Sequence, residues 1–180
     1  YDGGIASYTE NMDPNLDKHI VVNGYHFIGI STRGEDSYPT EVQNWLREEL
    51  EKAAADDPEK PIFVFMHHHL ENTVYVSRTW NTGFSSQIRN ILKKYPQVIH
   101  FSGHSHGPIN NPLTIWQDNF TTVGTGTLAY FEMESGMTEG TVPKSADQAA
   151  QFHIIEVDAN NRVRILPYNL LTDSFFKTPA

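Results

Sequence analysis

The chain has 180 residues, and 22 acidic against 13 basic residues give it a formal net charge of −9. One domain with a sizeable core is expected at this length, and the charge excludes the basic footprint of a nucleic-acid-binding protein. There is no Cys, which excludes disulfide scaffolds and thiolate zinc sites, and no apolar run approaches the roughly 20 residues of a membrane-spanning helix.

The first third of the chain predicts a loop, a hairpin and a helix. Residues 1–17 are polar and include a Gly-Gly pair, which favours a loop or a poorly tied terminus. Asn23-Gly24 separates two runs rich in β-forming residues, His19–Val22 and Tyr25–Ile30, and this is a strong hairpin signal. Pro39–Ala55 is the clearest helix, because its proline suits the first helical position and apolar residues recur at helical spacing. Those apolar residues are Val42, Trp45, Leu46, Leu50, Ala53 and Ala54.

Two short apolar strands follow, with a helix between them. Ile62–Met66 is too short and too apolar for a helix with an exposed face, and Val98–Phe101 has the same character. Ser85–Tyr95 carries apolar residues on one helical face and is followed by Pro96. Strands that are apolar on both faces are typical of parallel strands covered on both sides. The helix Pro39–Ala55 leads into the strand Ile62–Met66, so a βαβ-like arrangement is expected there, with this helix burying one side of the sheet.

The last part of the chain predicts strands joined by turns. Residues 107–119 contain two prolines and are expected to form a loop. Phe120–Phe131 is rich in Thr, Val and aromatic residues and favours a strand, interrupted by glycines that indicate a bulge or a close approach of the backbone. Gln151–Val157 and Arg162–Leu166 predict a hairpin, and Tyr168–Leu171 a further strand.

Histidines gather at the ends of the two apolar strands. Six of the nine lie at or beside these ends: His67, His68, His69, His100, His104 and His106. Imidazole is the commonest metal ligand among side chains, and in open α/β sheets ligands bind at the carboxyl ends of the strands. The pattern predicts a metal site assembled from distant parts of the chain.

The Gly-His-Ser-His-Gly segment allows two interpretations. If it is extended, His104 and His106 face the same way about 6.6 Å apart, so that each could bind one metal of a pair about 3.5–4 Å apart, or both could share one metal. The other interpretation is a turn with two solvent-exposed histidines. In the triple histidine, continued alternation would send His67 and His69 to one side and His68 to the other.

The remaining histidines and the acids add less. We expect His68 and His69 to be supporting or solvent-facing residues, and His100 to be a core histidine with a satisfied hydrogen bond. For His19, His26 and His153 the sequence predicts no partner. Three acids near the loops have no pattern that pairs them with the histidines, and these are Asp36, Glu71 and Asp118.

The segment Phe-Val-Phe-Met-His-His, the helix and strand after it, and Gly-His-Ser-His together resemble the C-terminal half of a calcineurin-like metallophosphoesterase. Purple acid phosphatases and cyclic-nucleotide phosphodiesterases belong to that family, and the resemblance runs from about His19 to Leu171. It implies an α/β (α+β) fold: half of a four-layer α/β/β/α sandwich with mixed sheets. It also implies two metal ions (manganese, iron or zinc), with His67 and His104 on one and His106 on the other, and hydrolysis of phosphate mono- or diesters by a metal-bound hydroxide.

The sequence departs from the family by omission. The family's Gly-Asp-x-x-Asp and Gly-Asn-His-(Asp/Glu) blocks, which supply the bridging carboxylate and further ligands, do not occur in it. We therefore expect residues 1–180 to be the C-terminal portion of one metallophosphoesterase domain, inactive alone. Its partners would be a phosphate ester and the missing N-terminal half, or a second copy through an exposed sheet. The alternative is a non-catalytic module with a histidine site or a partner-binding role.

Overall fold

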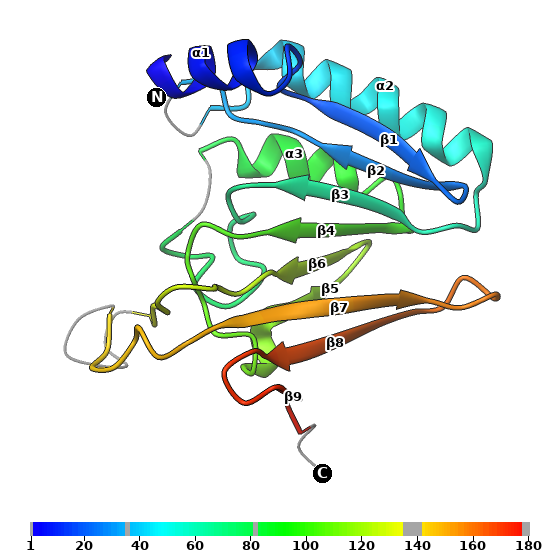
Figure 1. The fold of residues 1–180 in the computed structure, drawn as a ribbon. Coiled ribbons are helices and arrows are strands. Elements are labelled where there is room, and N and C mark those ends of the chain that lie inside the picture. Colours follow the sequence, from blue (N-terminus) through cyan, green and yellow to red (C-terminus); the bar gives the residue numbers. More distant parts are fainter. Residues whose placement is uncertain (1, 35–36, 81–82, 135–141, 178–180) are drawn as a thin grey trace.

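A mixed six-stranded sheet forms the centre of the computed structural model, which describes residues 2–34, 37–80, 83–134 and 142–177 (Figure 1). The strand order is β1-β2-β3-β4-β6-β5. Strands β2, β3, β4 and β6 run parallel, and β1 and β5 pair antiparallel at the two edges. The strand bounds are β1 Lys18–Val22, β2 Tyr25–Gly29, β3 Ile62–Met66, β4 Val98–Ser102, β5 Ile115–Gln117 and β6 Thr121–Gly124.

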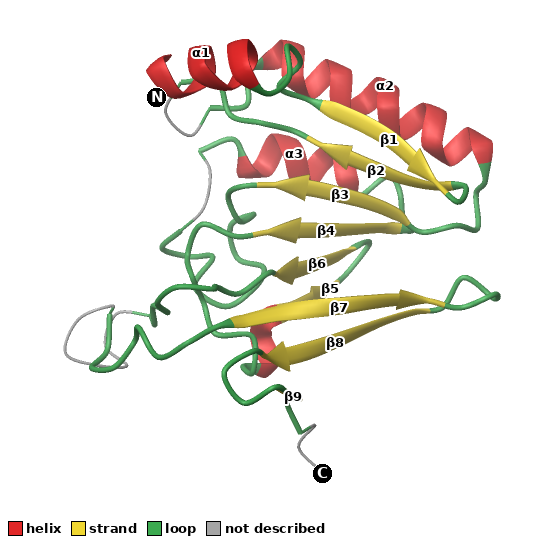
Figure 2. Ribbon diagram, in the orientation of Figure 1, coloured by secondary structure: helices red, strands yellow, loops and turns green. Residues whose placement is uncertain are grey.

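Helices cover one face of this sheet and a second sheet covers part of the other (Figure 2). Helices α2 (Thr40–Asp56) and α3 (Ser85–Leu92) share one buried apolar cluster with β2, β3 and β4. On the opposite face, apolar residues of the main sheet pack against a three-stranded antiparallel sheet, β7-β8-β9. Its strands are β7 Gln151–Val157, β8 Val163–Asn169 and β9 Ser174–Phe175. The layers are thus α/β/β, and the expected mixed α/β architecture is confirmed.

Most of the expected strands are present because their local signals are strong. Asn23 and Gly24 both have positive φ, 54° and 76°, as the tight turn between β1 and β2 requires. In β3 the side chains alternate between the two apolar clusters: Val64 belongs to the helix side, and Phe63 to the side of the second sheet. The expectation that these strands are covered on both faces is therefore partly met by the chain's own β7–β8 hairpin.

The N-terminal expectation was wrong. Residues 2–11 form helix α1 (Asp2–Asn11) rather than a loop. The helix carries few apolar residues, so the sequence gives no clear amphipathic pattern. Ile5 and Tyr8 line a pocket with Leu16 and Ser31, which shows that α1 lies against the segments before β1 and after β2. Periodicity alone does not predict this helix.

Several boundaries also differ from those expected. Pro39 is the residue before the first helical residue of α2, and α3 ends at Leu92, where Lys93 and Tyr95 form turn bonds. Residues 107–119 include a 3-10 turn, Pro112–Thr114, and strand β5. The strand expected over residues 120–131 shortens to β6, and residues 168–169 belong to β8, so that the last strand is β9. Among the described helices, none is both long and apolar enough to cross a membrane.

Candidate metal centre

The topology brings two histidine-bearing segments to one edge of the sheet. Strands β3 and β4 are parallel neighbours, and their last residues, Met66 and Ser102, are register partners. The residues that follow them must therefore meet at the carboxyl edge of the sheet. The backbone N–H of Gly103 donates a hydrogen bond to the carbonyl oxygen of His67 at 3.0 Å, which ties the two segments together immediately beyond the strands.

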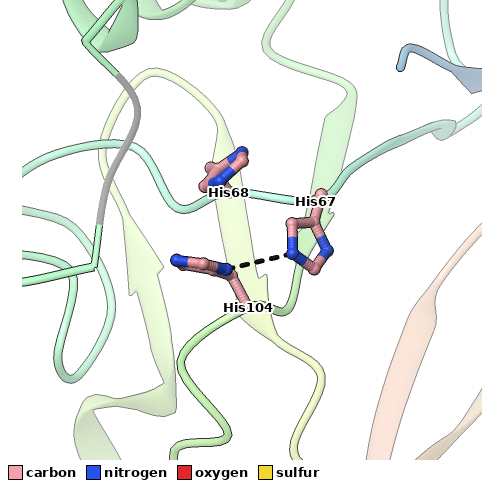
Figure 3. Close-up of side chains that lie close together, drawn as sticks. All are labelled: His67, His68 and His104. Atoms are coloured by element: carbon pink, nitrogen blue, oxygen red, sulfur yellow. Dashed lines mark hydrogen bonds between the residues drawn. The ribbon is translucent and has the colours of Figure 1, made fainter. Parts of the chain in front are cut away.

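Three imidazoles converge at this edge (Figure 3). One nitrogen from each of His67, His68 and His104 lies within 4.8 Å of the others. Nδ1 of His104 is 3.0 Å from Nε2 of His67. Two nitrogens on one tetrahedral zinc ion are about 3.3 Å apart, given zinc–nitrogen bonds of about 2.0–2.1 Å. An opening of a few tenths of an ångström would let this pair hold a metal ion.

The turn that carries His104 and His106 is not extended, contrary to one of the two interpretations of the sequence. His104 has φ 67° and His106 has φ 52°, both in the left-handed region. The two side chains consequently have different surroundings. His104 faces His67, whereas Nδ1 of His106 lies 3.1 Å from the backbone oxygen of Tyr130. The structure thus brings two of the three expected ligands together and places His106 beside another segment.

The alternation that a continuing strand would impose on the triple histidine does not occur, because β3 ends at Met66. His68 joins His67 beside His104, with ring centroids 4.8 Å and 4.4 Å from those two rings. His69 instead points toward β4, where its ring nitrogens contact two serine hydroxyls. Sequence reasoning missed His68 as a member of the cluster, and the only signal for it was its place directly after the strand-end histidine.

His69 supports the turn through two contacts with serine hydroxyls. Its Nδ1 is 2.8 Å from Oγ of Ser102, and its Nε2 is 2.6 Å from Oγ of Ser105. The Ser105 oxygen also accepts a hydrogen bond from the backbone N–H of Gly107. Burial lowers the pKa of His69 to about 3, helped by the neighbouring imidazoles. The side chain is therefore neutral near pH 7, which suits a supporting residue next to a cation site.

Burial differs across the three converging imidazoles. His67 is exposed and His104 half-buried, while His68 is only 1% exposed and lies edge-on to Tyr38, with ring centroids 6.4 Å apart. Trp80, from the loop after the triple histidine, stacks edge-on against His104 at 5.4 Å. The centre therefore has an aromatic wall on one side and an open side at His67, through which an ion or ligand can enter.

No carboxylate joins the three imidazoles in the part of the chain that the structure describes. Of the acids near the loops, Glu71 is exposed, Asp118 is exposed and Asp36 lies outside the described residues. Neutral imidazoles suit zinc and other borderline transition metals better than magnesium or calcium, which prefer oxygen ligands. The donor set therefore fits one transition-metal ion.

The other histidines serve elsewhere. His100 is fully buried in β4, as expected, with its Nδ1 2.5 Å from Oγ1 of Thr122. Its Nε2 has no hydrogen-bond partner among the described residues. Nε2 of His153 donates to the carbonyl oxygen of Gly124 at 3.0 Å. Burial lowers the pKa of His153, partly offset by that hydrogen bond. None of these side chains belongs to the converging cluster.

Comparisons with known proteins support the fold. No protein-family model matches the sequence, and no curated protein is significantly similar to it. A solved structure of a purple acid phosphatase isolated from yellow lupin (Lupinus luteus) seeds is similar, with a TM-score of 0.64 and 14% sequence identity. The match covers 92% of this chain and 32% of the phosphatase chain, so this chain spans about a third of the length of that protein. The chain has the fold of part of a calcineurin-like metallophosphoesterase.

Proposed function

We propose that this chain is part of a dinuclear metal-dependent phosphoesterase that hydrolyses phosphate mono- or diesters. The observation that carries the proposal is the meeting of His67 and His104 at the carboxyl ends of adjacent parallel strands, within a fold similar to that of a purple acid phosphatase. In this proposal His67 and His104 bind one metal, and His106 binds a second.

The surroundings of His106 suit a ligand. When Nδ1 of His106 donates to the Tyr130 carbonyl oxygen, Nε2 keeps its lone pair and is free to bind a cation. Metal-ligating histidines commonly donate their other ring N–H to a carbonyl or carboxylate in this way. Bound metal ions would activate a water molecule and offset the charge of a phosphate group. That offset matters, since the net charge of −9 otherwise repels phosphate.

A second candidate function is a single-metal site without catalysis. It is favoured by a specific observation: His68, rather than His106, shares a common point with His67 and His104. Three imidazoles can hold one zinc ion, and since structural zinc sites have four ligands, a partner would fill the fourth position. Under this alternative the chain would bind one cation for structural or partner-binding purposes.

The dinuclear proposal requires residues from outside this chain, and one surface suits their attachment. A groove of about 320 Å³ opens between the two sheets. Phe65, in the middle of the main sheet, is 40% exposed there and stacks on Phe101, with ring centroids 5.2 Å apart. An exposed apolar face of this kind marks a contact surface. We propose that the N-terminal half of the same domain covers it and supplies the bridging carboxylate, with a second copy of this chain as the competing occupant.

Zinc titration of single-histidine variants tests the ligand assignment. The apparent binding free energy of a four-ligand zinc site is about 10–16 kcal/mol, so one ligand is worth about 3 kcal/mol, or about a hundredfold in affinity. His67→Ala and His104→Ala should each weaken binding by about that factor, measured by calorimetry. His153→Ala, which removes an imidazole outside the cluster, is the control and should leave the affinity unchanged.

Two further variants separate the candidates. If His68→Ala weakens zinc binding and His106→Ala does not, this chain holds the single-metal site. Loss of affinity in His106→Ala, together with two bound ions when the upstream half is present, would support the dinuclear centre. The isolated chain should not hydrolyse an aryl phosphate with added zinc or manganese. Turnover that His104→Ala abolishes would show that the missing carboxylates are dispensable.

A further inference from the structure

Four side chains form a continuous hydrogen-bonded row between the β1–β2 hairpin and helix α2. Nδ1 of His19 is 2.5 Å from Oε2 of Glu49, and Nε2 of His19 is 2.7 Å from Nδ1 of His26. Nε2 of His26 is in turn 3.1 Å from Oδ2 of Asp56. The row runs carboxylate, imidazole, imidazole, carboxylate, and it joins residues about 30 positions apart in the sequence. None of its members belongs to the candidate metal centre.

The inner part of the row is buried and its outer end is exposed. His26 is 7% and Glu49 9% exposed, whereas the Asp56 side chain is 61% exposed. Lys52 donates a hydrogen bond to the second oxygen of Glu49 at 2.6 Å. Burial raises the pKa of Glu49, but the hydrogen bonds from Lys52 and His19 outweigh it, so that the pKa lies below its usual value. Glu49 is therefore an ionised acceptor near neutral pH.

The charged groups around the two imidazoles come mainly from α2. Glu49 and Asp56 contact the rings directly, and Lys52 acts through Glu49. On the hairpin, Lys18 pairs with Asp13. In the connection between α2 and β3, Lys60 and Asp57 pair with each other at 3.7 Å. The two imidazoles thus face two carboxylates, one of which also accepts a hydrogen bond from the Lys52 ammonium.

The geometry sets the number of protons. An ionised carboxylate only accepts hydrogen bonds, so the nitrogens facing Glu49 and Asp56 must both carry a proton. The two nitrogens that face each other need one proton between them, because two lone pairs or two N–H groups at 2.7 Å repel. Three protons on the four ring nitrogens, one more than two neutral imidazoles carry, would satisfy every contact of the row. The shared imidazolium and Lys52 then balance the two carboxylates.

We propose that His19 and His26 share this one extra proton. The hydrogen bonds that hold the β1–β2 hairpin to α2 then depend on the protonation of these two side chains. When the proton leaves, one outer nitrogen must present a lone pair to a carboxylate. The hydrogen bond between His26 and the exposed Asp56 breaks first, since Glu49 is buried and is also bonded to Lys52. When a second proton arrives, the inner pair becomes two opposed N–H groups and separates. The hairpin is therefore bound most strongly to α2 in the pH range where the two imidazoles carry one extra proton.

Nitrogen-15 NMR of the imidazoles tests the proton count directly. In the protein at neutral pH, the four ring nitrogens of His19 and His26 should show three bound protons. Asp56→Ala removes one acceptor, so the count should fall to two. Glu51→Ala, which removes an exposed carboxylate of the same helix outside the row, should leave it at three. Two protons in the unaltered protein at neutral pH would overturn the proposal.

Hydrogen exchange tests whether this protonation controls the attachment of the hairpin. Protection factors of the paired amides of β1 and β2 should pass through a maximum as pH is varied. They should fall about tenfold or more on either side, the factor expected from loss of one hydrogen bond to a charged group. Asp56→Ala should flatten the high-pH side of this maximum, and Glu51→Ala should not. An identical profile in all three proteins would show that the row does not control the hairpin.

Discussion

Acid is expected to destabilise the folded chain partly through His100. This side chain is fully buried, and burial lowers its pKa from 6.5 to about 3. In the unfolded chain the imidazole binds a proton below about pH 6.5, whereas in the folded chain it remains neutral down to about pH 3. The unfolded state therefore holds more protons throughout this window, and stability falls as the pH is lowered through it.

The size of the effect follows from the two pKa values. At pH 7 the contribution is negligible, at about pH 5 His100 should reduce the free energy of unfolding by about 2 kcal/mol, and at about pH 4 by about 3 kcal/mol. Domains of this kind have total stabilities of about 5–15 kcal/mol, so one residue accounts for a sizeable share of the acid sensitivity.

His100→Asn is the informative variant, because an amide can still hydrogen-bond Thr122 but does not titrate. Urea denaturation at about pH 7 and pH 5 should show that the original protein loses about 2 kcal/mol more than the variant between the two conditions. His153→Asn, at a half-buried position, is the control and should retain most of the original pH dependence. Equal losses in the original protein and in His100→Asn would refute the reasoning, since His100 would then titrate alike in both states.

Two other predictions concern the backbone and the apolar groove. Gly126→Ala should lower the free energy of unfolding by about 3 kcal/mol, because φ is +79° and the added Cβ would lie 2.6 Å from Ile109 Cγ2. Gly34→Ala, where φ is +65° with nothing within 4 Å, should cost only about 1 kcal/mol in the same denaturation assay, and equal costs would exclude the overlap as the cause. When the upstream half is absent, a second copy is the competing occupant of the groove, so Phe65→Ser, at a ring that is 40% exposed there, should weaken self-association in sedimentation experiments with little effect on folding. Unchanged association would place the contact elsewhere.

The amino-acid sequence determined the elements whose signals are local. Apolar runs bounded by polar residues predict β3 and β4 correctly, and the Asn-Gly pair predicts the first hairpin, because both depend on neighbouring residues alone. The apolar spacing of α2 likewise predicts a helix at the observed place. Helix α1 was missed, since it has no clear apolar stripe.

The sequence also indicated that His67 and His104 lie close together, though not the conformation in which they meet. The placing of His67 and His104 after two apolar strands predicted their proximity, because the carboxyl ends of parallel strands share one edge of a sheet. Their roles as ligands, and that of His106, remain predictions. Sequence periodicity does not predict the positive φ of His104 and His106, because it assumes a continuing strand.

Only the tertiary structure decided which side chains share a site. His68 enters the cluster because β3 ends at Met66, two residues before it, so the period-two alternation no longer governs its direction. His19 and His26 show no pattern linking them to Glu49 and Asp56, because those carboxylates lie about 30 residues away and reach the imidazoles only when α2 packs against the sheet. Local preference sets the elements, whereas contacts between distant residues depend on how those elements pack, and that packing is a property of the whole chain.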